Sequence, residues 1–233
     1  MLKNDDTHYV FFGSALAVAA SVDRPVKDFL TEQTSVVLSP SGGYAVQTRE
    51  QTNFREIIRT GRVNATVIGD ADAGDHISTL ATTTIENLDI LGFIKADAIV
   101  SRLTAVYKKG GEDDGVMHPT TFHIHGSAFY GLKIDGKHHD ISVERCAVDI
   151  PKDPNGRHIY TVDENSGYRL TAAGVGTKRL VVMDVAELGR IVLVEFDVFK
   201  GRANLTMLRV EFGCTIKGTG SVGVTCTNGH KGP

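Results

Sequence analysis

The histidines are the most unevenly placed reactive side chains of this chain, since five of the nine lie within 22 consecutive residues. His123 and His125 are two residues apart, so on a β-strand both project from the same face. A hairpin that turns near Asp135–Gly136 would bring His138 or His139 alongside them. Two or three converging imidazoles would suit Zn²⁺, Cu²⁺ or Ni²⁺ and would indicate a metal-dependent β-barrel enzyme.

Two features weaken this metal hypothesis. Cupin-type barrels hold metal on a His-x-His strand that also carries a glutamate a few residues further on, but Ala128 and Phe129 occupy that place. Asp140 or Glu144 would have to supply an oxygen ligand instead. The alternative is a solvated polar face beside Ser127, and because we favour it, no cofactor is predicted.

Acidic loops form a second candidate site. Asp70, Asp72 and Asp75, and the run Glu112–Gly115, offer the carboxylate oxygens that Ca²⁺ prefers. Neither loop has the spacing of an EF-hand, and solvated turns need no ion. Calcium binding and simple turns both stay open, with turns as the favoured interpretation.

Cys214 and Cys226 bracket a stretch that is centred on Gly220. If Gly220 lies in the middle of a hairpin turn, the two cysteines lie directly opposite each other, at a spacing that a disulfide accepts. We predict this disulfide, with unpaired thiols in a reducing compartment as the alternative. Cys146 has no evident partner in the sequence.

Other catalytic signatures are missing from the sequence. It has no Gly-x-Ser-x-Gly elbow, no phosphate-binding loop and no dinucleotide-binding glycine pattern. We therefore predict that the protein is not an enzyme.

The elements that would position these side chains are β-strands, because apolar residues alternate with a period of two along most of the chain. The clearest alternation predicts a single strand with one apolar face, made of Phe122, Ile124, Gly126, Ala128, Tyr130, Leu132 and Ile134. Further strands are predicted at 62–68, 78–91, 93–107, 140–148, 157–162, 168–172, 178–183, 189–200 and 204–214. Such spacing is typical of an antiparallel β-sandwich or barrel, and we predict a jelly-roll-like arrangement.

Helical signal is limited to two short segments. Asn53 and Glu56 have the spacing of a capping box and predict a short helix through Ile58, and Val185–Leu188 predicts a single turn. Neither is long enough for the crossover of a βαβ unit, and no linker or repeat divides the chain. We predict one all-β domain over residues 1–233.

The N-terminal segment Tyr9–Val22 carries no charge, which is typical of a central strand covered on both faces or of a strand that inserts into a neighbouring subunit. Its apolar part also has the form of a signal-peptide core, but Asp5 and Asp6 precede it where such a signal needs positive charge. We predict that residues 8–22 are exchanged between subunits, with pairing inside one subunit as the alternative. The side chains assigned to assembly are Tyr9, Phe11, Phe12, Leu16 and Val18.

Composition excludes several classes of function. A chain of 233 residues with 41% hydrophobic residues can bury a core, and its net charge of -3 offers no basic field to nucleic acid. No stretch approaches the roughly 20 apolar residues of a membrane-spanning helix. The lack of tryptophan counts against a carbohydrate-binding module, which would have to use Tyr44, Tyr107, Tyr130, Tyr160 and Tyr168.

Several short motifs together resemble a known family. In order they are Gly13–Val18, Ala81–Leu91, Ile94–Ser101, Gly126–Gly136, Gly189–Leu193, Leu205–Val210 and a terminal strand ending in Cys226. This order is similar to that of the bacterial choice-of-anchor P family. The resemblance implies an extracellular β-rich protein that is displayed on the cell surface and has no assigned enzymatic activity.

The chain departs from that family at two places. The family tends to have Leu-Asn-Glu-Gln where this chain has Leu193–Phe196, and the chain ends without a sorting signal or an apolar tail. Either an anchor has been trimmed, or the protein is retained by assembly with other subunits.

These observations predict a non-enzymatic structural or adhesive protein, located outside the cell or on its surface. We expect it to self-associate by strand addition, as the repeating subunit of a filament or surface layer. A metal-binding enzyme centred on the histidines and a carbohydrate-binding module remain the alternatives.

Overall fold

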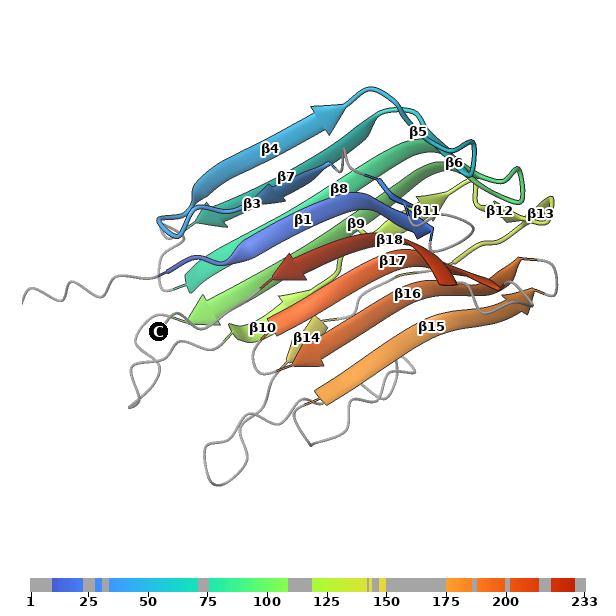
Figure 1. The fold of residues 1–233 in the computed structure, drawn as a ribbon. Coiled ribbons are helices and arrows are strands. Elements are labelled where there is room, and N and C mark those ends of the chain that lie inside the picture. Colours follow the sequence, from blue (N-terminus) through green and yellow to red (C-terminus); the bar gives the residue numbers. More distant parts are fainter. Residues whose placement is uncertain are drawn as a thin grey trace, which may run out of the picture.

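The chain forms strands and no helix over the residues that the structure, a computed structural model, describes (Figure 1). The all-β prediction is therefore confirmed, and none of those residues belongs to a helix that could cross a membrane. The described residues are 10–22, 28–30, 34–70, 76–108, 119–141, 143, 147–149, 175–185, 188–199, 202–213 and 219–228.

One sheet, which we call sheet A, combines strands from both ends of the chain. Its strands are β1 (Gly13–Val22), β2 (Asp28–Phe29), β3 (Ser35–Val37), β15 (Val175–Val185), β16 (Gly189–Phe199), β17 (Arg202–Gly213) and β18 (Thr219–Asn228). They lie in the order β15-β16-β17-β18-β1-β2, and β3 also pairs with β1. Strand β1 is thus paired on both sides within its own chain, and its first residue, Gly13, lies opposite Asn228.

The second sheet, sheet B, is built around three long antiparallel hairpin strands. Its strands are β4 (Gly43–Arg49), β5 (Thr52–Phe54), β6 (Ile58–Thr60), β7 (Val63–Asp70), β8 (His76–Ile90), β9 (Ile94–Lys108), β10 (Pro119–His123), β11 (Ala128–Tyr130), β12 (Lys133–Ile134), β13 (Lys137–His138) and β14 (Ala147–Asp149). Strands β7, β8 and β9 form its centre, β4 lies beside β7, and β10, β11 and β12 follow one another along the far side of β9. Both sheets consist mainly of sequential antiparallel hairpins.

The two sheets pack face to face, with β1, β17 and β18 of sheet A lying against β7, β8 and β9 of sheet B (Figure 1). Their facing apolar side chains form one buried cluster, which includes Ala17 and Leu205 from sheet A and Ile85 and Leu103 from sheet B. Burying one such leucine or isoleucine contributes about 1.5–3 kcal/mol to folding. This shared core makes the fold a sandwich of two sheets.

Strands β8 and β9 change the face that they bury at one transverse line, which continues through the β6–β7 and β11–β12 junctions on either side. We call this line the switch row, and its residues are Gly61, Asn87, Asp97 and Gly131. On β8, Ile85 and Leu88 are both buried, while Glu86 and Asn87 between them are exposed. Asn87 and Gly131 have positive φ angles of 50° and 59°, and a side chain at Gly131 would collide with the carboxylate of Asp97. The register of β8 and β9 is the same on both sides of this row, so the buried face changes without an inserted residue.

The helix predicted at Asn53–Ile58 is wrong, because this segment is the β5–β6 hairpin. The N–H of Ile57 donates to the carbonyl of Phe54 at 2.9 Å, and Arg55 and Glu56 between them have φ angles of 50° and 57°. Two positive φ angles are characteristic of the type I′ turns that join antiparallel strands. The turn predicted as helical at Val185–Leu188 likewise joins β15 to β16, with the N–H of Leu188 donating to the carbonyl of Val185.

The single strand predicted from Phe122 to Ile134 is interrupted. It follows β9 along its whole length, but from His123 to Ala128 it has one residue more than the facing segment of β9. The hydroxyl of Ser127 accepts the N–H of Arg102 at 2.9 Å and donates to its carbonyl at 3.1 Å, so a side chain replaces main-chain pairing there. The strands predicted at 157–162 and 168–172 lie outside the described residues.

Candidate functional site

Sheet B ends at an exposed strand that carries large apolar side chains. Among the described residues, β4 pairs with β7 alone, so its other side is an open edge. Tyr44 and Val46 project from the outer face of β4, with 64% and 46% of their surface exposed. Tyr44 lies directly opposite Ile68 of β7, which is also exposed. Three large apolar side chains therefore meet at one margin of the sheet.

The margin of sheet A beside β4 is formed by β3, whose Val37 is 67% exposed. This second margin is partly closed by β4 itself, because the side-chain oxygen of Gln47 accepts the main-chain N–H of Ser35 at 2.7 Å. We call Tyr44, Val46 and Ile68, which face outward from sheet B, the apolar edge. Val37 faces outward from sheet A, and β3 and β4 lie on the same side of the sandwich (Figure 1).

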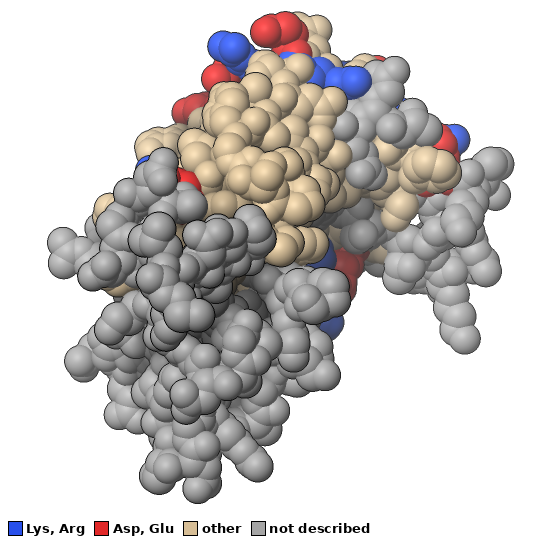
Figure 2. Space-filling view, turned by 90° about the vertical axis from the view of Figure 1, so that its left-hand side faces the viewer, with Lys and Arg blue, Asp and Glu red and all other residues tan. Residues whose placement is uncertain are grey.

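Charged side chains are scarce around the apolar edge. Arg49 is the one charged residue in the sequence of β4. Figure 2 shows the end of the sandwich where β4 begins and β3 and β7 end, and a broad area of its described surface is uncharged, with charges along the upper rim. Exposed apolar patches on a folded domain mark surfaces that contact a partner. The apolar edge is therefore the candidate functional site of the described structure.

Sequence analysis missed β4 as a strand. The turn signal Ser39–Gly43 precedes it, and the alternation of Tyr44, Val46 and Thr48 was the signal that could have revealed it. These three side chains share the outer face, where the hydroxyl of Thr48 donates to the side-chain oxygen of Asn64 at 3.0 Å. That bond ties β4 to β7 on its paired side.

The described residues among those predicted to mediate assembly lie in or next to β1, which pairs with strands of the same chain. Phe11 and Val18 are buried in the core, Phe12 and Leu16 are half-buried, and Tyr9 lies outside the described residues. The Phe11 ring lies so close to Gly42 that a β-carbon there would come within 2.6 Å of it. Strand β1 pairs with β18, β2 and β3 of the same chain, and its exchange between subunits stays a prediction.

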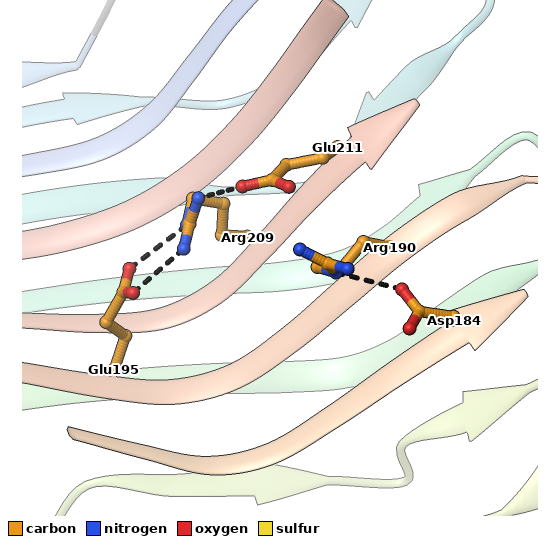
Figure 3. Close-up of polar contacts among 5 residues, drawn as sticks. All are labelled: Asp184, Arg190, Glu195, Arg209 and Glu211. Carbon is orange, nitrogen blue, oxygen red and sulfur yellow. Dashed lines mark hydrogen bonds and ion pairs between the residues drawn. The ribbon is translucent and has the colours of Figure 1, made fainter. Parts of the chain in front are cut away.

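Charged side chains gather on sheet A, on strands β15 to β17 (Figure 3). Arg209 donates two hydrogen bonds to the carboxylate of Glu195, at 3.0 and 2.8 Å, and a third to Glu211. Arg190 donates to Asp184 at 2.8 Å, and this hydrogen bond and the charge of Asp184 raise the pKa of Arg190 above its usual value. We call these five residues the charged ladder. Its two arginines pair with three carboxylates on β15, β16 and β17, so these contacts hold neighbouring strands together.

The first pair of predicted metal ligands does not share a strand. His123 is half-buried at the end of β10, opposite Thr104 of β9. His125 is exposed in the irregular segment after β10, where Gly126 has a φ of 85°. Strand β10 ends at His123, so the single strand on which the two imidazoles were predicted to project together stops before His125. Their predicted shared face stays a prediction.

The second pair lies at the other end of β9. His138 is exposed on β13 and pairs with Lys133, which pairs with Lys95, and His139 is half-buried beside it. Thr104 and Lys95 are nine residues apart on β9, or about 30 Å at roughly 3.3 Å per residue. The described structure therefore does not bring His138 or His139 alongside His123. No group of three potential metal ligands occurs within the described part of the chain.

The remaining predicted ligands lie partly outside the described residues. Asp140 is exposed, and Glu144 is not described. Asp70 ends β7, whereas Asp72, Asp75 and the run 112–115 are not described, so calcium binding stays a prediction.

The register of β17 and β18 differs from the one on which the disulfide prediction was based, and the disulfide itself stays a prediction. Gly213 lies opposite Thr219, and Gly220 belongs to β18 rather than to the middle of a turn. The residue of β17 opposite Cys226 is Leu205, and Cys214 lies outside the described residues. Gly220 pairs with Phe212 of β17, so it lies within a strand where the sequence predicted a turn.

The tyrosines proposed for carbohydrate binding are dispersed. Tyr107 is fully buried in the core, while Tyr44 and Tyr130 are exposed on strands separated by β7, β8 and β9. Tyr160 and Tyr168 lie outside the described residues. The described tyrosines thus do not form one continuous aromatic platform.

The described residues form an all-β sandwich domain in which the margin at β4 is open and carries few charges. The chain belongs to the family described as a domain of unknown function (DUF8256), which matches residues 9–171. No curated protein and no solved structure matches the chain. The matched segment contains the whole apolar edge, whereas the charged ladder lies beyond it. No comparison links the chain to the choice-of-anchor P family, so that resemblance stays a prediction.

Proposed function

We propose that this protein is a non-enzymatic structural component that self-associates through the open margin of its sandwich. The observation that carries the proposal is the apolar edge: three large apolar side chains that are exposed together on the outer face of sheet B, at its open margin. Unpaired strand edges offer rows of main-chain donors and acceptors to another strand, and proteins that must stay separate protect them with charges. The sequence of β4 has only Arg49 for this purpose.

The proposal keeps assembly by strand addition but moves it from β1 to β4. Strand β1 lies between β18 and β2 or β3, so using it for exchange would require opening those pairs. Strand β4 needs no such opening, because its free side is already at the margin. Addition to an existing edge is therefore the route with the smaller structural rearrangement.

The proposed role includes a location outside the cell or on its surface, which is supported by the resemblance to choice-of-anchor P proteins. We expect an antibody against the purified protein to label unpermeabilised cells of the producing organism. Labelling that requires permeabilisation would contradict this location.

Sedimentation velocity and negative-stain electron microscopy of the purified full chain test the assembly itself. Over a concentration series we expect species heavier than the 25.1 kDa chain, or ordered polymers at the highest concentrations. A monomer at every concentration would overturn the proposal.

A further inference from the structure

We infer that two copies of the chain pair through β4, antiparallel and centred on Val46, so that sheet B continues from one copy into the other. The inference rests on the proposed function and deepens it, because it names the strand that is used and the partner that fits it. A two-fold axis would pass beside Val46, and the interface would be isologous.

The choice of β4 follows from a comparison of the described margins. Strand β15 is the margin of sheet A opposite β3, and its sequence carries Lys178, Arg179 and Asp184, the kind of charges that discourage pairing. Strand β3 is three residues long, and Gln47 already caps the N–H of Ser35. Strand β4 has seven residues, and its free side is open among the described residues. It is therefore the longest edge with few charges.

The side chains of β4 suit pairing with a second copy. In the antiparallel register centred on Val46, this residue lies beside the partner's Val46 on the outer face. Tyr44 lies beside the partner's Thr48, an aromatic and β-branched pair of the type that stabilises neighbouring strands. The two exposed apolar side chains of each β4 would thus be covered by the same strand of the other copy.

Charge selects the antiparallel orientation. Arg49 would lie opposite the partner's Gly43, which leaves the two arginines six residues apart along the strands. That separation is about 20 Å at roughly 3.3 Å per residue, beyond a screening length of about 8 Å at physiological salt. A parallel pair in register would instead place Arg49 directly beside the partner's Arg49, where like charges repel. Two copies of β4 therefore pair more favourably in the antiparallel orientation than in the parallel one.

The test uses charge reversal at the axis. Val46→Lys and Val46→Glu each place two like charges side by side in a symmetric pair, while an equimolar mixture places lysine beside glutamate. Val182→Lys is the matched control, because Val182 of β15 is 45% exposed and Val46 is 46% exposed. Sedimentation equilibrium measures the dissociation constant of each sample, and circular dichroism checks that each variant is folded.

For the full chain we expect a dimer, with a mass twice 25.1 kDa. Each Val46 variant alone should raise the dissociation constant at least about tenfold, or 1.4 kcal/mol, and the mixture should restore it, with Val182→Lys unchanged. Folded Val46 variants that associate as tightly as the unmodified chain would overturn the β4 inference while the proposed assembly stands. An unmodified chain that stays monomeric would overturn both.

Discussion

The ion pair between Arg209 and Glu195 is the charged contact on which folding should depend most. The Glu195 side chain is 10% exposed and receives two of the three Arg209 hydrogen bonds. Removing one member of such a pair leaves a partly buried charge with fewer partners, which destabilises a protein more than losing an exposed pair does.

Glu195→Gln should therefore lower the free energy of unfolding by about 1–3 kcal/mol in urea titrations. Asp184→Asn is the control within the same charged ladder, because Asp184 is 73% exposed. Asp184→Asn should change the free energy of unfolding by less than about 0.5 kcal/mol. Equal effects of the two substitutions would contradict this assignment.

The ring of Phe11, which precedes β1, packs closely against the backbone at Gly69. A β-carbon at Gly69 would come within 2.6 Å of the Phe11 ring and 2.7 Å of Leu38, closer than real atoms pack. Gly69→Ala should therefore destabilise the protein by about 1–3 kcal/mol through overpacking.

A double-mutant cycle with Phe11→Leu checks that contact by thermal unfolding. The smaller side chain at position 11 leaves room for the new methyl group, so the double variant should be less destabilised than the sum of the two single variants. Strict additivity would show that the Gly69 backbone is constrained by something other than the Phe11 ring.

At the scale of single elements, the switch row is where β8 and β9 change the face that they bury. Asn87 adopts a φ of 50°, a conformation that asparagine and glycine tolerate and β-branched residues avoid. Asn87→Val should lower the free energy of unfolding by about 1–2 kcal/mol, whereas Asn87→Gly should change it little. Chemical denaturation of both variants distinguishes backbone strain from loss of the asparagine side chain, since the latter would affect the two variants alike.

Sequence periodicity predicted the long hairpins but not where they switch faces. The runs predicted at 62–68, 78–91 and 93–107 match β7, β8 and β9 within a few residues, because alternation of buried and exposed side chains continues along most of each strand. The predicted strand at 122–134 shows the limit of that signal. In the sequence, apolar and polar residues alternate there without a break. The structure has an extra residue near Gly126, which is accommodated by contacts between Ser127 and Arg102, far away in sequence.

The hairpin at Phe54–Ile57 shows why a local motif can mislead. The side-chain oxygen of Asn53 accepts the N–H of Glu56 at 3.1 Å, as the capping-box spacing predicts. The same bond closes a β-turn here, because Ile58 of β6 pairs with Ile90 of β8. Pairing with a distant strand therefore overrides a helix signal of only a few residues.

The candidate site was beyond sequence reasoning for a related physical reason. Tyr44 and Val46 are unremarkable until the pairing of β4 with β7 alone leaves them at a margin, and that pairing depends on the whole order of sheet B. The histidines were conspicuous in the sequence, but His123 lies opposite Thr104 of β9, whereas His138 pairs with Lys133, which lies opposite Lys95 near the other end of β9. Proximity along the chain was a poor guide to proximity in the sheet.

At the scale of the whole molecule, the interface should be insensitive to salt. Pairing of β4 with a second copy buries apolar side chains and main-chain groups, and keeps the two Arg49 side chains about 20 Å apart. We therefore expect the dissociation constant to change by less than about threefold between 0.05 and 0.5 M NaCl in sedimentation equilibrium. A steep weakening with salt would indicate that charged surfaces such as the charged ladder form the contact instead.

The position of β1 beside β18 has a mechanical consequence. Gly13 at the start of β1 lies opposite Asn228 at the end of β18, so forces that pull these two ends apart load a single pair of hydrogen bonds at a time. Antiparallel strands loaded in this way unzip, whereas strands pulled along their length resist with all their bonds together. A layer built from these sandwiches would therefore bear tension best when load passes from sheet to sheet across the subunits rather than through the two ends of the chain.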